Sequence, residues 1–442
     1  MTESFLIGAA HRVITPSLGS PMAGFDARKG VSTGVHDNLH ASALVFEHNG
    51  VCAAIVSVEV ITISRDFSAK VRKEIERITG IPAGNIVLSA THTHCGPVTQ
   101  NHFFNQGQAL DEQYLEWLAG EICEATQDAF AQRAPRRLRT GFARCEGIAT
   151  NRRTADGHPF DPLAGILLVE EPNGNPYAVA VSFACHPTVL GPNTLEISED
   201  FPFFTLEALR KQLGQGVEAM YFNGAEGDLS IGHKSDLSAV GIIEPYRNFE
   251  TARRLGETLA GAVLAALPTL ERETGPLSVQ RITARLPLKQ YAPSKQMTEA
   301  RILAQKAMES ASSLPLAEQL PTRQRSLFAR MEEYYAILYE AESGESPKTL
   351  NTELTAIRLG ETSLVTLPGE IFVAVALGIR ERSPMARTMF LGLANDYIGY
   401  LPSEGAVVSA GYEVVASRVT ADAWRTLQDA ALDVLHRLKA EG

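Results

Sequence analysis

The feature that most constrains the fold is an alternation of short apolar runs with longer amphipathic segments in the first third of the chain. Residues 41–46 and 52–61 are rich in small and β-branched side chains and flank an Asn-Gly turn, which predicts two adjacent strands. Residues 64–79 have the apolar period of a helix that ends at Gly80, and residues 85–90 return to a strand-like apolar run. Strand, helix and strand in this order are typical of an α/β protein.

The rest of the chain continues this alternation. Further strands are predicted at 165–170, 176–183, 219–222, 352–359 and 363–367. Further helices are predicted at 111–133, 199–212, 248–270 and from Glu370 to about residue 382. No stretch is rich enough in Pro, Gly or Ser to separate autonomous domains. We therefore expect a single α/β domain over residues 1–442, with mixed β-sheets flanked by helices.

Residues 294–343 differ from the rest because they are highly charged and keep a helical period throughout. This pattern predicts a helical hairpin, inserted into the α/β domain. The hairpin is expected beside the core, over a binding site as a lid, or in a contact between two copies of the chain.

The charge balance excludes one broad class of function. With 40 Lys and Arg against 51 Asp and Glu, the formal net charge is -11, whereas a nucleic-acid-binding protein needs a basic face. The five cysteines contain no Cys-x-x-Cys pair, which favours a reducing compartment. The N-terminus lacks the basic region of a signal peptide, and no apolar run approaches the roughly 20 residues that span a bilayer. We expect a soluble, cytoplasmic protein without a stable membrane anchor.

Three histidines stand where predicted strands end. His92 and His94 follow the strand at 85–90, and strand alternation would place both side chains on one side. His186 follows the strand at 176–183 in the same way. Ligand sites of open α/β sheets lie at the carboxyl ends of strands, so the three imidazoles are candidates for metal binding or acid–base chemistry. The alternatives are surface histidines that end a strand and, for His186, a hydrogen-bonded core histidine.

Other polar candidates lie in loops. Ser230 ends a glycine-containing loop, 221–230, and is a nucleophile, a hydrogen-bond donor or part of a tight turn. Glu370 opens a predicted helix, where a carboxylate commonly complements the helix dipole. The Arg152 side chain is expected either to bind a carboxylate or phosphate group or to face solvent. The aromatic loop at 395–402 serves either packing or function.

In this order, the motifs resemble the neutral/alkaline ceramidase family, the non-lysosomal N-acylsphingosine amidohydrolases. The resemblance rests on segments spread over nearly the whole chain: 7–10, 22–25, 89–97, 151–152, 185–187, 223–230, 368–370 and 395–412. The most specific is Thr-His-Thr-His with Gly-Pro shortly after it, within 91–97. The resemblance implies the family's N-terminal catalytic domain and zinc-dependent hydrolysis of an N-acyl amide.

The resemblance also implies a role for individual residues. The Zn²⁺ ligands that it implies are His92, His186, Glu370 and Tyr400. The residues that it implies around the reacting bond are His94, Arg152, Ser230 and Tyr412. The spacing of twelve residues between the two tyrosines matches the family pattern.

Two loops depart from the family pattern and bear on the expected substrate. Residues 95–99 read Cys-Gly-Pro-Val-Thr, and Ile231-Gly232 follow Ser230 where the family has Pro-Asn. The family's C-terminal immunoglobulin-like domain and a secretion signal are not expected in this chain. We therefore expect an N-acyl substrate that is smaller or more soluble than ceramide. The alternatives are an ester or lactone hydrolase with the same metal centre, and a catalytically silent metal-binding protein that interacts through the hairpin.

Overall fold

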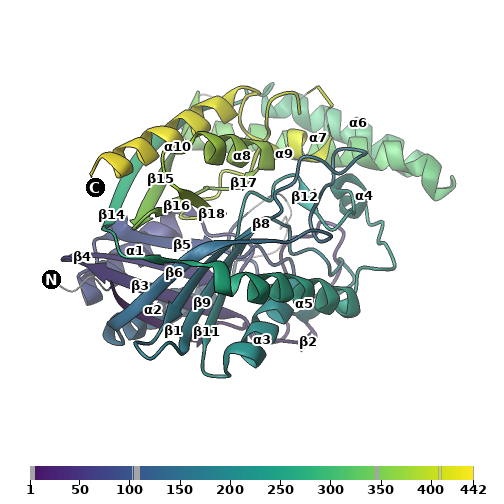
Figure 1. The fold of residues 1–442 in the computed structure, drawn as a ribbon. Helices are drawn as coiled ribbons and strands as arrows, with labels where there is room; N and C mark the ends of the chain where they lie inside the picture. The colour runs from purple at the N-terminus through teal and green to yellow at the C-terminus, as the bar shows by residue number, and fades with distance from the viewer. Residues whose placement is uncertain are drawn as a thin grey trace.

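The computed structural model describes residues 5–101, 103, 110–343, 348–406, 408–409 and 411–441. Figure 1 shows the strands gathered in the middle of this part of the chain, with helices on either side of them. Most of the described strands belong to a nine-stranded or a four-stranded sheet. The predicted α/β fold, with mixed sheets flanked by helices, is confirmed.

The nine-stranded sheet combines parallel and antiparallel pairs. Its order is β11-β9-β8-β6-β1-β3-β4-β5, and β13 pairs with β6. β11 runs parallel to β9 and β4 runs parallel to β5, whereas the pairs between β9 and β4 are antiparallel. In chain order the strands are β1 (Phe5–Val13), β3 (His40–His48), β4 (Val51–Val58), β5 (Ile86–Ala90), β6 (Ala134–Arg144), β8 (Leu163–Glu170), β9 (Pro176–Phe183), β11 (Glu218–Asn223) and β13 (Glu271–Glu273).

Helices cover the outer face of this sheet. α1 (Arg65–Thr79) and α2 (Glu112–Ala131) pack on one half of it, and α3 (Phe201–Leu213) and α5 (Phe249–Ala266) pack on the other half. Strand alternation supplies the apolar contacts, because every second residue of a strand faces the same way. In β4, Ala54, Val56 and Val58 face the helices.

Local sequence signals explain where α1 begins and ends. Ser64 precedes the helix, and its hydroxyl oxygen accepts a hydrogen bond from the Phe67 amide at 3.3 Å. Val71 and Ile75, one helical turn apart, are buried against the sheet. Gly80 ends the helix with a φ of 77°, a left-handed conformation that glycine adopts without a steric penalty.

A second sheet packs on the inner face of the first. Its order is β14-β15-β16-β18. Its apolar side chains share one buried cluster with those of the large sheet, and its far face is covered by α8 (Val373–Arg382) and α10 (Ala423–Ala440). The molecule therefore has four layers, in the order helices, sheet, sheet, helices (Figure 1). The four strands are β14 (Leu277–Pro287), β15 (Thr349–Leu359), β16 (Thr362–Thr366) and β18 (Arg387–Leu391).

The predicted helical hairpin is present. α6 (Ser294–Ser310) and α7 (Leu316–Ser343) pack against each other and lie in the chain between the paired strands β14 and β15. α7 also packs on the short helix α9 (Tyr412–Ala416). The hairpin is thus an insertion in the smaller sheet that reaches one of the predicted site segments.

The carboxyl ends of strands distant in the sheet order meet at one place. The Ser57 hydroxyl in β4 donates to the Tyr221 carbonyl in β11 at 2.5 Å. The Asn223 side-chain amide at the end of β11 donates to the Thr91 carbonyl at 3.2 Å. The loops that leave β5, β9 and β11 therefore converge, and these loops carry the predicted site histidines and Ser230.

One local prediction is wrong. Glu370 does not open a helix, because Glu370 and Ile371 form the two-residue strand β17 (Glu370–Ile371), which pairs with β19 (Tyr400–Leu401). The Glu370 amide donates to the Gly399 carbonyl at 3.1 Å, and α8 begins three residues later at Val373.

The described helices were also searched for membrane spans, and none of them combines the length and the apolar composition that a bilayer requires.

Candidate functional site

His92 lies in the loop directly after β5, with its side chain almost fully buried. Its backbone has a φ of 71°, a sparsely populated conformation for a residue with a side chain and one that clusters at functional sites. Its Nδ1 lies 2.7 Å from the Ile61 carbonyl oxygen, so the Nδ1–H donates there and Nε2 is left as a lone-pair donor. This loop geometry, rather than strand alternation, turns His92 and His94 toward each other.

His186 follows β9 and is oriented in the same manner. Its Nδ1 lies 2.8 Å from the Glu226 carbonyl oxygen and 2.9 Å from the Leu229 carbonyl oxygen. The Nδ1–H therefore points at backbone acceptors, and Nε2 faces the Glu370 carboxylate, whose Oε2 lies 2.9 Å away. A backbone carbonyl that fixes the tautomer of an imidazole is typical of metal-binding histidines.

Glu370 brings a carboxylate to the same point from the other side of the molecule. Its Oε2 lies 3.6 Å from His92 Nε2, and its Oε1 accepts a hydrogen bond of 2.5 Å from the Tyr397 hydroxyl. Burial alone would raise the pKa of the Glu370 carboxyl, but the imidazoles of His92 and His186 hold that pKa well below its usual range. Glu370 is therefore ionised.

These spacings fit a metal ion. Ligand atoms around a tetrahedral zinc with bonds of roughly 2.0–2.2 Å lie about 3.3 Å apart. The spacings from Glu370 Oε2 to His186 Nε2 and to His92 Nε2 are 2.9 and 3.6 Å. Two neutral imidazoles and a carboxylate are also the donor types that zinc takes in hydrolases. The fourth predicted ligand, Tyr400, lies beside Glu370 because β19 pairs with β17.

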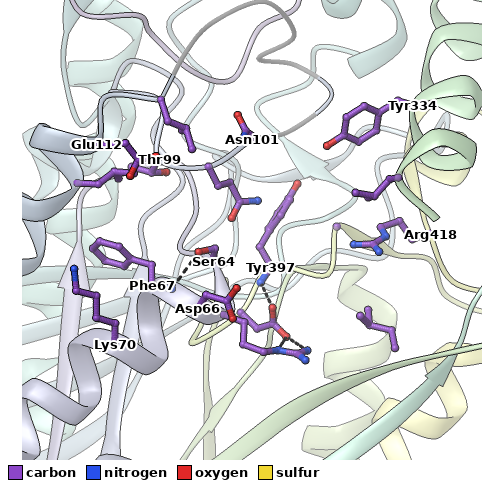
Figure 2. A pocket seen from close by; sticks show the side chains of 18 of the residues that line it. Ser64, Asp66, Phe67, Lys70, Thr99, Asn101, Glu112, Tyr334, Tyr397 and Arg418 are labelled. Atoms are coloured by element: carbon purple, nitrogen blue, oxygen red, sulfur yellow. Dashed lines mark hydrogen bonds and ion pairs between the residues drawn. The ribbon is translucent and has the colours of Figure 1, made fainter. Parts of the chain in front are cut away.

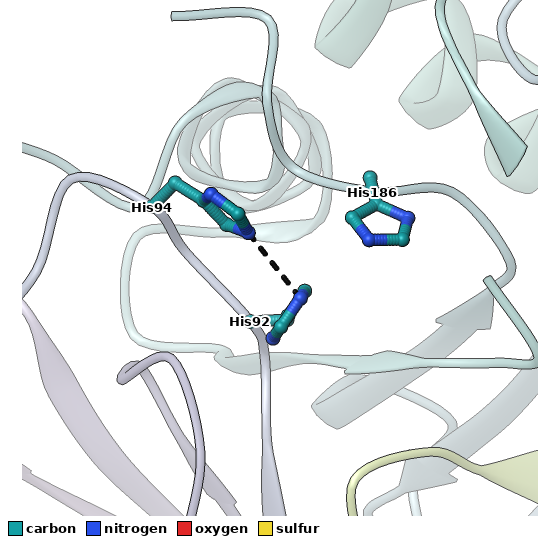
Figure 3. Close-up of side chains that lie close together, drawn as sticks. All are labelled: His92, His94 and His186. Atoms are coloured by element: carbon teal, nitrogen blue, oxygen red, sulfur yellow. Dashed lines mark hydrogen bonds between the residues drawn. The ribbon is translucent and has the colours of Figure 1, made fainter. Parts of the chain in front are cut away.

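His94 reaches the same centre but is held differently. Its Nε2 lies 3.3 Å from His92 Nε2 (Figure 3), and its buried Nδ1 has no hydrogen-bond partner among the described residues. Phe25 packs on the ring, with centroids 4.8 Å apart, and a Cβ on Gly24 would lie 2.5 Å from His94 Nδ1. Burial lowers the pKa of His94 well below its usual value, and the neighbouring imidazoles lower it further. The distance alone would also suit a ligand, whereas His94 lacks the carbonyl partner that orients the other two histidines.

Arg152 follows the short strand β7 (Thr150–Asn151) and is buried in a network of hydrogen bonds. Its Nε donates to Glu413 Oε1 at 2.8 Å, and its Nη2 donates to the Gly227 carbonyl at 3.0 Å and to the Tyr400 hydroxyl at 3.2 Å. Burial would raise the pKa of Glu413, but Arg152 and Arg153 keep that pKa below its usual range. The network holds the guanidinium beside a predicted metal ligand.

Tyr412 and Ser230 complete the predicted set. Tyr412 begins α9, and its ring lies 6.0 Å from the ring of Tyr400. Burial raises the pKa of the Tyr412 hydroxyl well above its usual value, so the phenol stays protonated. Ser230, in β12 (Leu229–Ser230), donates its hydroxyl hydrogen to the His233 carbonyl at 2.8 Å and accepts from the Gly232 amide at 3.1 Å. Ser230 thus closes a tight turn behind the site.

Two cavities flank the centre. A small cavity of about 40 Å³ is lined by His94, Arg152, His186, Tyr400 and Tyr412, among others. An open pocket of about 920 Å³ lies on the Tyr397 side, between the start of α1 and α7 (Figure 2). The Tyr397 hydroxyl bonds to Glu370, so this side chain separates the open pocket from the carboxylate.

Glu226 and His233 lie at the site, but the sequence analysis assigned no role to either of them. Glu226 is fully buried, and a carboxylate oxygen of it lies within 4.8 Å of the ligand atoms of His92 and Glu370. His233 lines the small cavity and lies 3.2 Å from the Thr188 hydroxyl through Nε2. The only sequence signal was the position of both residues in or just after the glycine-containing loop that leaves a buried strand.

Sequence comparisons point to one family. Residues 5–158 match the family described as neutral/alkaline non-lysosomal ceramidase, N-terminal. Neutral ceramidase B of Dictyostelium discoideum is 26% identical over 255 residues, which are 52% of this chain and 36% of that protein. Neutral ceramidase A of the same organism is 26% identical over 218 residues, which are 45% of this chain and 30% of that protein. The matches thus span about a third of the length of these curated relatives.

Structural comparisons extend the likeness to the whole fold. The crystal structure of neutral ceramidase from Pseudomonas aeruginosa superposes with a TM-score of 0.77 and 19% identity, covering 99% of this chain and 75% of that chain. A structure described as ceramidase complexed with C2 gives a TM-score of 0.77 and 17% identity, covering 99% and 76%. These findings confirm the resemblance seen in the sequence: residues 5–158 match the neutral/alkaline non-lysosomal ceramidase family, and the fold is similar to that of neutral ceramidase.

Proposed function

We propose that the protein is a zinc-dependent hydrolase that cleaves the amide bond of an N-acyl substrate. The observation that carries this proposal is the meeting of His92, His186 and Glu370 at 2.9 and 3.6 Å, with the Nδ1 of each imidazole turned to a backbone carbonyl. The family relationship supports the reaction class, because its named members are ceramidases.

In this proposal His92, His186, Glu370 and Tyr400 hold the zinc ion. When bound, the ion supplies a Lewis acid that polarises the amide carbonyl and lowers the pKa of water. The hydrogen bond from Tyr397 to Glu370 orients the carboxylate, and the Arg152 guanidinium 3.2 Å from the Tyr400 hydroxyl stabilises negative charge on that oxygen.

The remaining residues act on the substrate itself. Amide hydrolysis passes through a tetrahedral intermediate whose oxygen carries negative charge, and fixed donors stabilise this charge. Tyr412 and Arg152, both of which line the small cavity, are the proposed donors. The amine leaves only when protonated, and His94, whose Nδ1 has no protein partner in the described structure, is the proposed proton donor. Ser230 holds its loop in place rather than attacking the substrate.

The shape of the site supports a small or polar N-acyl substrate. The cavity beside the proposed ligands holds about 40 Å³, and α7 packs Leu327 and Met331 into one cluster with Tyr400 and Tyr412. The larger open pocket is lined by apolar and aromatic side chains such as Phe67, Leu115 and Leu338, with charged side chains among them. These charged side chains are Arg65, Asp66, Lys70, Glu112, Glu116 and Arg418. A long acyl chain does not fit into the small cavity beside the proposed ligands.

Two further parts of the proposal concern the cellular compartment and the oligomeric state of the protein. We propose a reducing, cytoplasmic setting, which the five free cysteines support. We also propose the exposed apolar side chains of the hairpin, such as Leu303, as a surface through which the chain can form oligomers.

The test is a substrate panel measured with zinc-loaded protein. It contains short-chain and polar N-acyl amides, the matched esters and lactones, and long-chain ceramide in mixed micelles. We expect the highest kcat/KM for a short or polar amide. Faster turnover of the matched ester or lactone would favour the ester hydrolase, and turnover of none would favour a silent metal-binding protein. A tenfold preference for long-chain ceramide would refute the proposed substrate size while keeping the amide hydrolase.

A further inference from the structure

Glu226 is a buried carboxyl group that forms no side-chain hydrogen bond within the described ranges. Its side chain has no exposed surface, and neither carboxylate oxygen has a hydrogen-bond partner among the described residues. Other buried glutamates of the described structure differ from it. Glu370 accepts from Tyr397 and faces His186, and Glu413 is bonded to Arg152 and Arg153. Burying an ionised carboxylate costs free energy unless a cation lies beside it, so a bound cation would account for the position of Glu226.

Among the described residues, no Lys or Arg side chain bonds to the Glu226 carboxylate. The guanidinium of Arg152 is committed to Glu413, to the Gly227 carbonyl and to Tyr400. The backbone around Glu226 is also fixed, because its carbonyl oxygen accepts from His186 Nδ1 and from the Leu229 amide. The same loop that orients His186 therefore presents the Glu226 side chain to the metal centre.

The position of Glu226 matches that of a metal ligand. One of its carboxylate oxygens lies within 4.8 Å of the ligand atoms of both His92 and Glu370. Donor atoms that share one ion through bonds of roughly 2.0–2.2 Å are separated by about 3 to 4 Å. The Glu226 carboxylate has no hydrogen bond within the described ranges that would oppose a shift toward the ion. The neighbouring Gly227 permits this packing, because a Cβ there would lie 2.4 Å from the Glu370 carbonyl oxygen.

We propose that Glu226 is a second carboxylate ligand of the metal, so that the centre contains two imidazoles, two carboxylates and the Tyr400 phenol. This inference rests on the proposed metal-dependent function and extends its ligand set. Two carboxylates match the charge of a divalent ion. They also make the centre richer in oxygen donors, which harder ions such as Mn²⁺ prefer.

The experiment compares metal binding by the wild-type chain and by Glu226→Gln, with Glu199→Gln as the matched control. Glu199 is also a buried glutamate with an unpartnered oxygen, but it is not among the residues grouped around the centre. Zn²⁺ affinity is measured by competition with a chelator, and the ligand field is read from the visible absorption of bound Co²⁺. We expect Glu226→Gln to weaken Zn²⁺ binding by more than the roughly 10- to 100-fold that loss of an outer-shell partner costs. Its Co²⁺ spectrum should also change, while the control keeps both properties.

The outcomes separate the two proposals. If wild-type protein binds neither ion, the proposed metal-dependent function is overturned, and the role of Glu226 with it. If wild-type protein binds Zn²⁺ and Glu226→Gln has the same affinity and the same Co²⁺ spectrum, only the role of Glu226 is overturned. Circular dichroism of the metal-free proteins shows whether each variant folds. Should Glu226→Gln fail to fold, Glu226→Asp replaces it, and wild-type affinity and spectrum in that variant would overturn the proposal.

Discussion

His92 and His94 are two residues apart, yet their surroundings prepare them for different work. His92 donates its Nδ1–H to the Ile61 carbonyl, which leaves Nε2 as a fixed lone-pair donor. His94 has no such partner and is held by packing against Phe25 and Gly24. A ligand needs one fixed orientation, whereas a group that transfers protons needs a free nitrogen near the substrate.

The first prediction tests this difference. We expect His92→Ala to lose most of its zinc, because a centre without one of its two oriented imidazole ligands holds a metal poorly. We expect His94→Ala to keep its zinc and to lose about 10²–10⁴-fold in kcat, the usual range for a lost acid–base group. Elemental analysis and steady-state kinetics of both variants measure this. Equal loss of zinc from the two variants would show that His94 is also a ligand.

The second prediction concerns the glycine behind His94. Gly24 has a φ of 99°, and a Cβ there would lie 2.5 Å from His94 Nδ1, so Gly24→Ala must displace the imidazole. We expect kcat to fall at least tenfold with zinc content unchanged. Gly19→Ala is the matched control, since Gly19 also has a positive φ, of 86°, but no atom within 4 Å of the added Cβ. If both variants lose activity equally, backbone strain rather than contact with His94 is responsible.

The third prediction concerns the carboxylate that holds Arg152. Glu413→Gln leaves a buried guanidinium uncompensated, and we expect the free energy of unfolding at pH 7 to fall by about 3–5 kcal/mol. The pKa of Glu413 is depressed in the folded state, so its contribution is present above the unfolded carboxyl pKa and is lost as the pH falls through the folded one. Denaturant unfolding across pH should therefore show wild type and variant converging in acid. A constant difference at every pH would contradict this account.

At the scale of elements, α7 connects the inserted hairpin with the site. Leu327 and Met331 on this helix share a buried cluster with Tyr400 and Tyr412. Met331 is 1% exposed, whereas Ile337 on the same helix is 50% exposed. The helix therefore positions the two tyrosines as well as covering them.

The fourth prediction follows from this packing. Met331→Ala should lower the free energy of unfolding by about 2–5 kcal/mol, the usual cost of truncating a buried methionine. It should also lower kcat/KM, because the tyrosines lose a supporting contact. Ile337→Ala, the control, should change neither quantity. Loss of stability without loss of kcat/KM would mean that the hairpin supports the fold but not the site.

Some elements with a clear period were predicted from the sequence, although the amphipathic helix α10 was not among them, and elements whose state depends on tertiary packing were missed. β4 and α1 were found because their apolar residues follow the periods of a strand and a helix. β6 and β14 were missed because both interleave arginines with apolar residues, and only pairing with other strands decides their state. Glu370 was placed in a helix because its pairing with Tyr400 in β19 spans thirty residues and leaves no local signal.

The same limit applies to the site. The motifs found His92, His94, His186 and Glu370, and the structure brings all four together. The carbonyl partners of the histidines and the approach of Glu226 depend on how the loops after four strands, β4, β5, β9 and β11, meet. Such contacts between distant segments have no period and no fixed spacing in the chain.

At the scale of the whole molecule, four layers bring together site residues that are far apart in sequence. The loops after β5 and β9 supply histidines from the large sheet, and β17 and β19 supply Glu370 and Tyr400 from the half of the chain that carries the small sheet. The site thus lies where the two halves of the fold meet. Metal binding at this junction should stabilise the whole fold, because the ion joins both halves only when the protein is folded.

We propose that a metal held at this junction makes the protein an amide hydrolase. The most direct measurement follows amine release from a short-chain N-acyl amide by metal-free protein, and again after one equivalent of Zn²⁺ is restored. We expect the metal-free protein to hydrolyse the amide no faster than background, and zinc to restore full activity. Undiminished hydrolysis by protein shown by elemental analysis to be free of transition metals would contradict this proposal.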